Sequence, residues 1–142
     1  MSDEIFQALI NKSEEEPFAR HLGIRVLDVG EGYAQVEMHL EPSSANIHGI
    51  PHGGAIFSLI DEAFEMASNS HGAIAVALNM NITYTAPARI GTVVRAEARE
   101  QSCSRRTATY DIRVEDESGG LIAICQALVY RKDDRLPFLK NS

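Results

Sequence analysis

Residues 46–69 read NIHGIPHGGAIFSLIDEAFEMASN, and this stretch decides the fold because it contains a long, clear helical pattern. The segment before Gly53 is irregular and rich in turn formers. The apolar residues after it recur at helical spacing: Ile56, Leu59, Ile60, Ala63, Phe64 and Ala67. Polar residues and a glycine follow at 68–72, as expected where a helix ends. We therefore expect one long amphipathic helix that opens with Gly53 and Gly54.

Upstream of this helix, the chain shows one short helical segment and two strand-like segments. Residues 3–12 place apolar side chains at helical spacing, and residues 13–17 break that pattern. Residues 22–29 are typical of a strand, and residues 33–41 alternate apolar and polar side chains as a half-buried strand does. The glycines within residues 30–32 predict a turn between the two strands.

Downstream of the helix, the pattern is that of β-structure. Alternation or apolar runs predict four strands, at residues 76–84, 92–100, 105–115 and 121–130. Turn-forming residues separate them at 86–91 and 117–120. Because the last segment is apolar on both faces, we expect it to form an inner strand of the sheet.

Two strands, one long helix and four further strands predict an α+β domain with one sheet of about six mostly antiparallel strands. The sheet must curl around the helix to bury its apolar stripe. Such a sheet leaves an edge strand exposed, and pairing with a second copy would cover that edge. The 142 residues contain no repeat, linker or low-complexity segment, so residues 1–142 are expected to form a single domain.

The composition argues against several classes of protein. The net charge of −7 disfavours nucleic-acid binding, which requires a basic face. No apolar stretch approaches the roughly 20 residues that span a bilayer, so no membrane association is expected. The acidic start Met1–Glu4 lacks a signal-peptide pattern, and Cys103 and Cys125 lack the spacing of a metal or redox site. We expect a cytoplasmic protein with reduced thiols.

Gly53 and Gly54 at the helix start have a chemical interpretation and a structural one. Glycine costs about 1 kcal/mol relative to alanine inside a helix, but it leaves the backbone N–H groups open to a ligand. Those N–H groups carry the positive end of the helix dipole and suit an oxyanion that forms on a carbonyl oxygen. The alternative is a tight turn where the chain passes under the sheet.

Asp61 supplies a carboxylate that can act as a base or a nucleophile. It lies 61 − 53 = 8 residues after Gly53, which is about 12 Å along a helix. One carbonyl carbon therefore cannot touch both groups of the same chain. A partner subunit whose helix runs antiparallel would bring its own carboxylate to this glycine, and two-fold symmetry would create two such sites.

The surroundings of Asp61 predict a raised pKa. Phe57 and Phe64 flank it at one turn's distance and would exclude water, and the charge of Glu65 acts in the same direction. The alternative is a solvated helix face, on which Glu62 and Glu65 are ordinary surface charges.

The histidines near these residues do not complete a metal site. His48 and His52 are four residues apart, but glycine and proline intervene and no nearby acid or cysteine supplies further ligands. We expect His52 to support the glycine turn or to contact substrate.

Arg105 and Arg106 open a strand and Arg89 lies in the preceding turn, so a cluster at one end of the sheet would bind phosphates. The alternative is a set of solvated charges.

Taken together, these residues resemble a known family. The pattern Asn46-x-x-Gly49-x-x-His52-Gly53-Gly54, followed by Asp61, resembles the hotdog-fold acyl-CoA thioesterases of the PaaI type. The segment Asn79-Met80-Asn81-Ile82-Thr83-Tyr84-x-x-Pro87-Ala88 is similar to the strand that follows in that family. The resemblance covers about residues 18–131 and implies a long central helix wrapped by a curved sheet. It also implies a homodimer, often paired into a homotetramer, with active sites between subunits.

The resemblance implies roles for individual residues. Gly53 would polarise the thioester carbonyl through its N–H, and Asp61 of the partner subunit would attack that carbonyl or activate water. Asn46 would hold the water or the leaving region, and His52 would support the turn. No metal or redox cofactor is implied, because coenzyme A is part of the substrate. Further substrate contacts are expected from Gly54, Phe57, Phe64 and Asn79, and contacts with the CoA phosphates from Arg89, Arg105 and Arg106.

Two other functions stay open beside hydrolysis of an acyl-CoA thioester to free acid and CoA. A hotdog enoyl-CoA hydratase or dehydratase usually needs a helix histidine, and the helix has none between Gly53 and Ser70. A non-catalytic acyl-CoA sensor would not need Asp61 and would usually bring a DNA-binding segment, for which the N-terminal region is too short and too acidic. The acyl group itself is not encoded in the sequence pattern.

Overall fold

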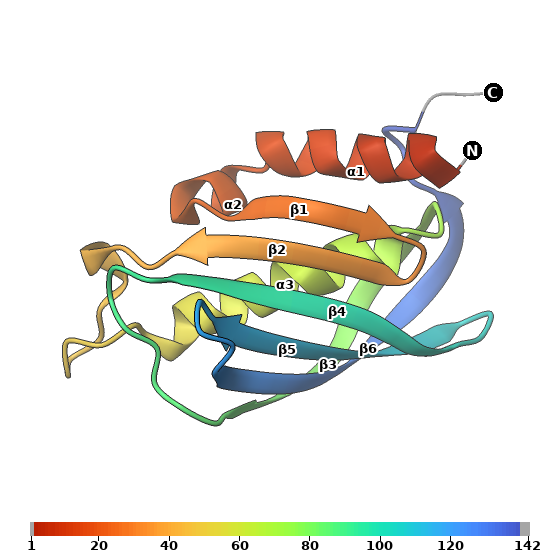
Figure 1. Ribbon diagram of the computed structural model, residues 1–142. Helices are drawn as coiled ribbons and strands as arrows, with labels where there is room; N and C mark the ends of the chain where they lie inside the picture. Colours follow the sequence, from red (N-terminus) through yellow and green to blue (C-terminus); the bar gives the residue numbers. More distant parts are fainter. Residues whose placement is uncertain (1, 140–142) are drawn as a thin grey trace.

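Six antiparallel strands form one curved sheet in a computed structural model, which describes residues 2–139 (Figure 1). In spatial order the strands are β1 (Arg25–Gly30), β2 (Tyr33–His39), β4 (Val93–Cys103), β5 (Thr107–Asp116), β6 (Leu121–Arg135) and β3 (Ala73–Tyr84). Every neighbouring pair is antiparallel. The α+β class with a six-stranded sheet around one long helix is therefore confirmed.

The long helix α3 (Gly53–Asn69) lies against the inner face of the curved sheet (Figure 1). Its apolar stripe packs mainly on β2 and β4. Phe64 of α3 meets Tyr110 of β5 edge to face, with the ring centroids 5.6 Å apart, and both side chains are buried. Burial of a side chain such as Phe64 stabilises the fold by about 1.5–3 kcal/mol. This core fixes α3 on the sheet and therefore fixes the position of its first residue.

Two helices precede the sheet where one was expected. Helix α1 spans Ser2–Glu15 and lies along β1 (Figure 1), and a second helix, α2, spans Pro17–Leu22. The break expected at 13–17 shrinks to Glu16, because proline fits the first turn of a helix, where its missing N–H is not needed.

The first strand consequently starts later than residue 22. Leu22 ends α2, and Gly23 closes that helix in the left-handed region with φ of 72°. Strand β1 then begins at Arg25. A short 3-10 helix, Pro42–Ser44, lies in the segment expected to be irregular. No helix within residues 2–139 is long and apolar enough to cross a bilayer.

The strands after α3 are longer than expected at their outer ends. Strand β3 starts at Ala73 and β6 continues to Arg135, and these two residues pair. Strand β6 lies between β5 and β3, which confirms the prediction of an inner strand. Its outward side chains Ile124 and Tyr130 are nevertheless exposed, because no element within residues 2–139 covers them on the outer face of the sheet.

Strand β3 forms an open edge of the sheet. It pairs with β6 on one side only, whereas the opposite edge strand, β1, runs beside α1. Val76 and Leu78 on β3 are 41% and 56% exposed. An edge strand with exposed apolar side chains is a surface on which a further strand can pair.

Candidate active site

The loop before α3 folds around the side chain of Asn46. Its Oδ1 accepts hydrogen bonds from the N–H groups of His48, at 2.8 Å, and Ile50, at 3.3 Å. The Asn46 N–H donates to the Ile50 carbonyl at 2.7 Å. Gly49 completes the loop with φ of 78°, a conformation that glycine adopts without strain. Asn46 therefore holds the loop that leads into the helix, and its contact with water or with the leaving region stays a prediction.

His52 caps the start of α3. Its Nδ1 accepts a hydrogen bond from the Gly54 N–H at 2.8 Å. Its carbonyl accepts the N–H groups of Ala55 and Ile56 at 2.9 and 3.4 Å. Of the first four N–H groups of the helix, only that of Gly53 has no protein acceptor among residues 2–139. The positive end of a long helix thus presents one open donor, and it belongs to Gly53.

Tyr84, at the end of β3, packs directly against Gly53. The Tyr84 hydroxyl donates to the Gly53 carbonyl at 2.9 Å. A Cβ on residue 53 would lie 3.1 Å from both Cζ and Oη of Tyr84, so a larger residue would displace the ring. A depression of about 330 Å³ opens here, with Ile50, Gly53 and Tyr84 among its lining residues. Tyr84 was not among the site residues predicted from the sequence, although its place at the end of the strand segment 79–84 was a signal for it.

Asp61 lies on the outward side of α3, two turns beyond Gly53. Its pKa is raised, first because neighbouring protein atoms partly desolvate the carboxylate and second because the negative charge of Glu16 repels it. The direction agrees with expectation but the charged neighbour does not, since Glu65 was expected to act. Within one protomer the rise of the helix keeps Asp61 and Gly53 about 12 Å apart.

Glu62 is buried, which contradicts the alternative interpretation in which it is an ordinary surface charge. It is only 6% exposed, and its Oε2 accepts a hydrogen bond from the Ser13 hydroxyl at 2.7 Å. One carboxylate oxygen from each of Glu16, Glu62 and Glu65 lies within 4.8 Å of the others. Burial, followed by repulsion within this acidic trio, raises the pKa of Glu62 and of Glu65. The segment that joins α1 to α2 covers this face of α3. The sequence of α3 alone does not predict that a distant segment buries Glu62.

The two phenylalanines near Asp61 have different surroundings. Phe57 is half-buried at the surface of α3, whereas Phe64 is 1% exposed in the core against Tyr110. Phe64 therefore does not flank the carboxylate as expected, because its side chain points under the sheet. Asn79 is exposed on the edge strand, where a bulge after Ala77 shifts the pairing with β6.

The three candidate phosphate-binding arginines do not form one cluster within a protomer. Arg105 and Arg106 lie in the turn after β4, and both pair with Asp133 of β6 at 3.6 and 3.0 Å. Arg89 lies in the loop before β4 and within electrostatic reach of Asp116. The length of β4, roughly 30 Å at 3.3 Å per residue, separates the two groups. The prediction that the three arginines form one cluster at one end of the sheet is therefore wrong. Arg89 lies before β4 and the other two lie after it, at its opposite end.

A cavity of about 480 Å³ lies between α1, the second half of α3 and the C-terminal segment, with Glu16, Glu65 and Phe138 in its wall. Neither Gly53 nor Asp61 lines it. This cavity therefore does not join the open N–H to the carboxylate, which the rise of α3 keeps about 12 Å apart within one protomer.

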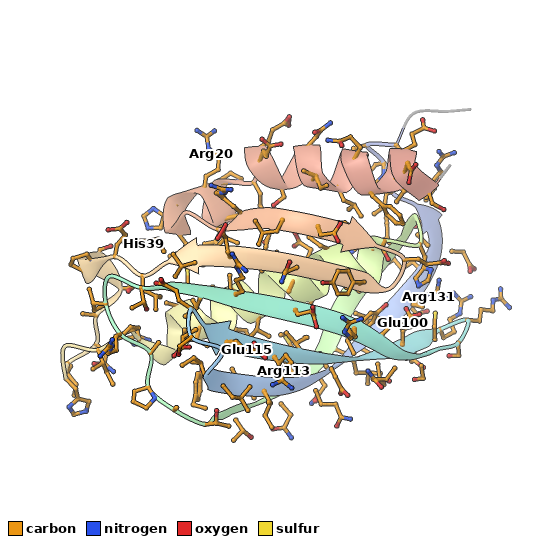
Figure 2. All side chains as sticks on the ribbon, viewed as in Figure 1. Arg20, His39, Glu100, Arg113, Glu115 and Arg131 are labelled. Carbon is orange, nitrogen blue, oxygen red and sulfur yellow. The ribbon has the colours of Figure 1, made fainter. Side chains whose placement is uncertain are left out.

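A second group of polar side chains lies where α3 ends, at the far end of β4. The structure brings together His71, Glu100 and Cys103, which the sequence analysis did not associate. Glu100 and Arg131 lie together in this region (Figure 2). His71, Glu100 and Cys103 could not be associated from the sequence, because residue 71 is distant along the chain from residues 100 and 103 and no spacing motif connects them.

The sequence is similar to a known family and to individual proteins. The family model described as the thioesterase superfamily matches residues 48–123. A putative esterase of Archaeoglobus fulgidus is 43% identical over 116 residues, covering 82% of this chain and 75% of the relative. The acyl-coenzyme A thioesterase PaaI of Escherichia coli is 32% identical over 131 residues, covering 92% of this chain and 94% of the relative.

Solved structures extend the comparison to the fold. The structure of the E. coli PaaI protein from the phenylacetic acid degradation operon superposes with a TM-score of 0.90 at 30% identity, covering 94% of this chain and 97% of that chain. The structure of smu.793 from Streptococcus mutans, bound to acetyl CoA, matches with a TM-score of 0.76 at 25% identity, covering 80% and 91%. The sheet wrapped around α3 is therefore the hotdog fold that the family resemblance implied.

Proposed function

This chain belongs to the thioesterase superfamily, and on that premise we propose that it hydrolyses acyl-CoA thioesters to free carboxylic acid and CoA. The observation that carries the proposal is the open N–H of Gly53 at the start of α3. The name of the E. coli relative, an acyl-coenzyme A thioesterase, and the acetyl CoA in the S. mutans structure support the choice of substrate.

The Gly53 N–H is the donor for the developing oxyanion. During attack on a thioester, the carbonyl oxygen gains negative charge, and a fixed donor at a helix start stabilises that charge by a few kcal/mol. Gly54 cannot share this role because its N–H is bonded to His52. Gly54 contributes by its small size, since a Cβ there would lie 3.1 Å from His52 Nδ1.

The carboxylate comes from a second copy of the chain. Pairing of β3 with its own copy about a two-fold axis continues the sheet and covers Val76 and Leu78. The two α3 helices then run antiparallel, and each site combines Gly53 of one protomer with Asp61 of the partner subunit. The exposed Ile124 and Tyr130 on the outer face of the sheet offer a surface on which two dimers pair into a tetramer.

Asp61 has two chemical routes available. As a general base, it takes a proton from water, whose oxygen attacks the carbonyl carbon, and the C–S bond then breaks as CoA leaves with that proton. As a nucleophile, its oxygen attacks the carbonyl carbon, CoA leaves as the thiolate, and water hydrolyses the resulting anhydride. The raised pKa favours the first route, since a base with a pKa nearer the working pH accepts a proton more effectively.

The remaining substrate contacts follow from the positions of the side chains. Phe57, one turn before Asp61, contacts the acyl group. Asn79 pairs with Leu128 on the outer face of the sheet, away from α3, so this position does not support a role in holding the attacking water. The CoA phosphates lie along the subunit boundary, near either Arg89 or the pair Arg105 and Arg106, because one protomer does not bring all three together. Neither chemical route requires a metal or a redox cofactor.

Replacement of Asp61 by asparagine tests the proposal. Purified wild type is assayed against phenylacetyl-, hydroxybenzoyl- and medium- to long-chain acyl-CoA esters, with Ellman detection of released CoA. On the best substrate, Asp61→Asn should lower kcat by at least about 100-fold, while Asp28→Asn, at an exposed acid on β1, should not. Full turnover by folded Asp61→Asn would remove Asp61 from the mechanism. Loss of enoyl-CoA absorbance without thiol release would point to a hydratase instead.

A further inference from the structure

A bulge in β4 places Glu100 and Cys103 on the same face of the sheet. Side chains three residues apart on a regular strand point to opposite faces. Here Glu100 pairs with Tyr110 and Cys103 pairs with Ala108, and the register shifts between Glu100 and Ser102, so that Gln101 is the extra residue. Tyr110 and Ala108 both face the core. The bulge therefore turns the Cys103 thiol toward the inner face, where the carboxylate of Glu100 lies.

His71 reaches the same place from the turn that follows α3. Its Nε2 lies 2.7 Å from Glu100 Oε1, and its side chain is 17% exposed. One ring nitrogen of His71, one carboxylate oxygen of Glu100 and the Cys103 sulfur all lie within 4.8 Å of one another. Three potential metal-ligand atoms, a nitrogen, an oxygen and a sulfur, thus come close together from three separate parts of the chain.

Neighbouring groups hold this constellation in place. The Tyr110 hydroxyl donates to Glu100 Oε1 at 2.6 Å and orients the carboxylate. Glu31 Oε1 lies 3.6 Å from Nδ1 of His71, on the other side of the ring. Glu31 comes this close because Gly32 lies against Glu100, where a Cβ would be 2.8 Å from that of Glu100. A carboxylate behind a histidine is a common way to orient that histidine toward a metal ion.

We propose that His71, Glu100 and Cys103 bind a divalent cation of the Zn²⁺ class. A nitrogen, an oxygen and a thiolate sulfur suit the borderline-soft Zn²⁺, whereas Mg²⁺ and Ca²⁺ select oxygen ligands alone. Zn²⁺ binds such atoms at about 2.0–2.3 Å, so a tetrahedral site spaces its ligand atoms by about 3.5 Å. The three atoms lie within 4.8 Å of one another here, and ion binding would draw them to that closer spacing.

The charges around the site also favour a cation. Glu31 and Glu100 supply two negative charges, and Arg131 supplies one positive charge nearby. A bound cation would itself convert the Cys103 thiol to the thiolate. The Arg131 guanidinium is directed to the Ser104 carbonyl, at 2.7 Å, and so belongs to the hairpin between β4 and β5. A bound ion would join the end of α3 to this hairpin and stabilise both. This site goes beyond the proposed hydrolysis, in which it takes no part.

Cobalt binding tests the proposal directly, because a thiolate bound to Co²⁺ gives a charge-transfer band in the near ultraviolet. Chelator-treated, fully reduced protein is titrated with Co²⁺ and then with Zn²⁺ as competitor. Wild type should bind one Co²⁺ per chain with that band, lose the band to Zn²⁺, and melt at a higher temperature with Zn²⁺ present. The matched control is Cys125→Ser, at the other thiol, which is buried on β6 and should leave all three results unchanged.

Two variants identify the ligands. Cys103→Ser, at an exposed residue where the fold tolerates change, should abolish the band and weaken Zn²⁺ binding by at least about 100-fold. His71→Gln should weaken Zn²⁺ binding to a similar degree in protein whose circular dichroism is unchanged. The proposal is overturned if reduced wild type gives no band, or if Zn²⁺ binds Cys103→Ser as tightly as wild type. In either case the group is a protein-only hydrogen-bond network around His71.

Discussion

The Tyr84 hydroxyl holds the Gly53 carbonyl at 2.9 Å, and so ties the end of the edge strand β3 to the first residue of the central helix. The same peptide region presents the open Gly53 N–H. A change at either residue therefore acts on the proposed oxyanion donor, and a change at the β3 edge acts on the approach of the partner subunit.

Gly53→Ala should lower kcat by about 100-fold or more, the cost of disturbing one oxyanion donor. The added Cβ would lie 3.1 Å from Tyr84 Cζ and Oη, which forces the ring and the peptide apart. Steady-state thiol release on the best acyl-CoA substrate measures the effect. Tyr84→Phe keeps the ring and removes only the hydrogen bond, so it should cost no more than about tenfold. Equal rates for Gly53→Ala and wild type would place the oxyanion elsewhere.

Mixed dimers should regain activity that neither parent has. A dimer of one Gly53→Ala chain and one Asp61→Asn chain contains one site with both changes and one intact site. Random exchange of equal amounts makes about half of the dimers mixed, so the mixture should recover about a quarter of wild-type activity. Co-expression with two different affinity tags isolates the mixed species for assay. Recovery should be absent if Gly53 and Asp61 of the same chain act together.

Glu16→Gln should move the acid limb of the pH profile of kcat/KM to lower pH. The Glu16 charge helps to raise the pKa of Asp61, and the active form of Asp61 is the ionised one, so removal of that charge allows ionisation at lower pH. Activity at the acid end of the profile rises relative to wild type. Glu14→Gln, at an exposed acid in the last turn of α1 two residues before Glu16, is the matched control and should leave the limb in place. If the acid limb of the kcat/KM profile stays in place in Glu16→Gln, another group controls that limb.

The double substitution Val76→Lys with Leu78→Lys should convert the protein to monomers and abolish turnover. Lysine on an exposed strand edge opposes pairing with a like-charged copy, and the proposed site requires two copies. Light scattering coupled to size exclusion measures the mass, and circular dichroism checks the fold. Phe18→Lys places the same charge on an apolar residue of α2 that is 61% exposed, and should change neither quantity. Active monomers of the double variant would disprove a shared site.

Local patterns predicted α3, six strands and the inner position of residues 121–130, because each of these depends on side-chain periodicity within one element. Residues 46–54 and Asp61 were also selected from the sequence, since glycines before an amphipathic helix signal an open helix start. The second N-terminal helix, α2, was missed, because the proline that begins it is equally typical of a break.

Tertiary structure alone decided which of these groups meet. Glu16 reaches Glu62 and raises the pKa of Asp61 only because the α1–α2 junction folds onto α3. Arg89 and Arg105 separate because β4 runs its full length between them. Cys103 joins His71 and Glu100 only because a single extra residue in β4 reverses its face. Periodicity determines which side of an element a residue occupies, whereas the packing of distant elements determines its neighbours, and the charges and donors of a site depend on those neighbours.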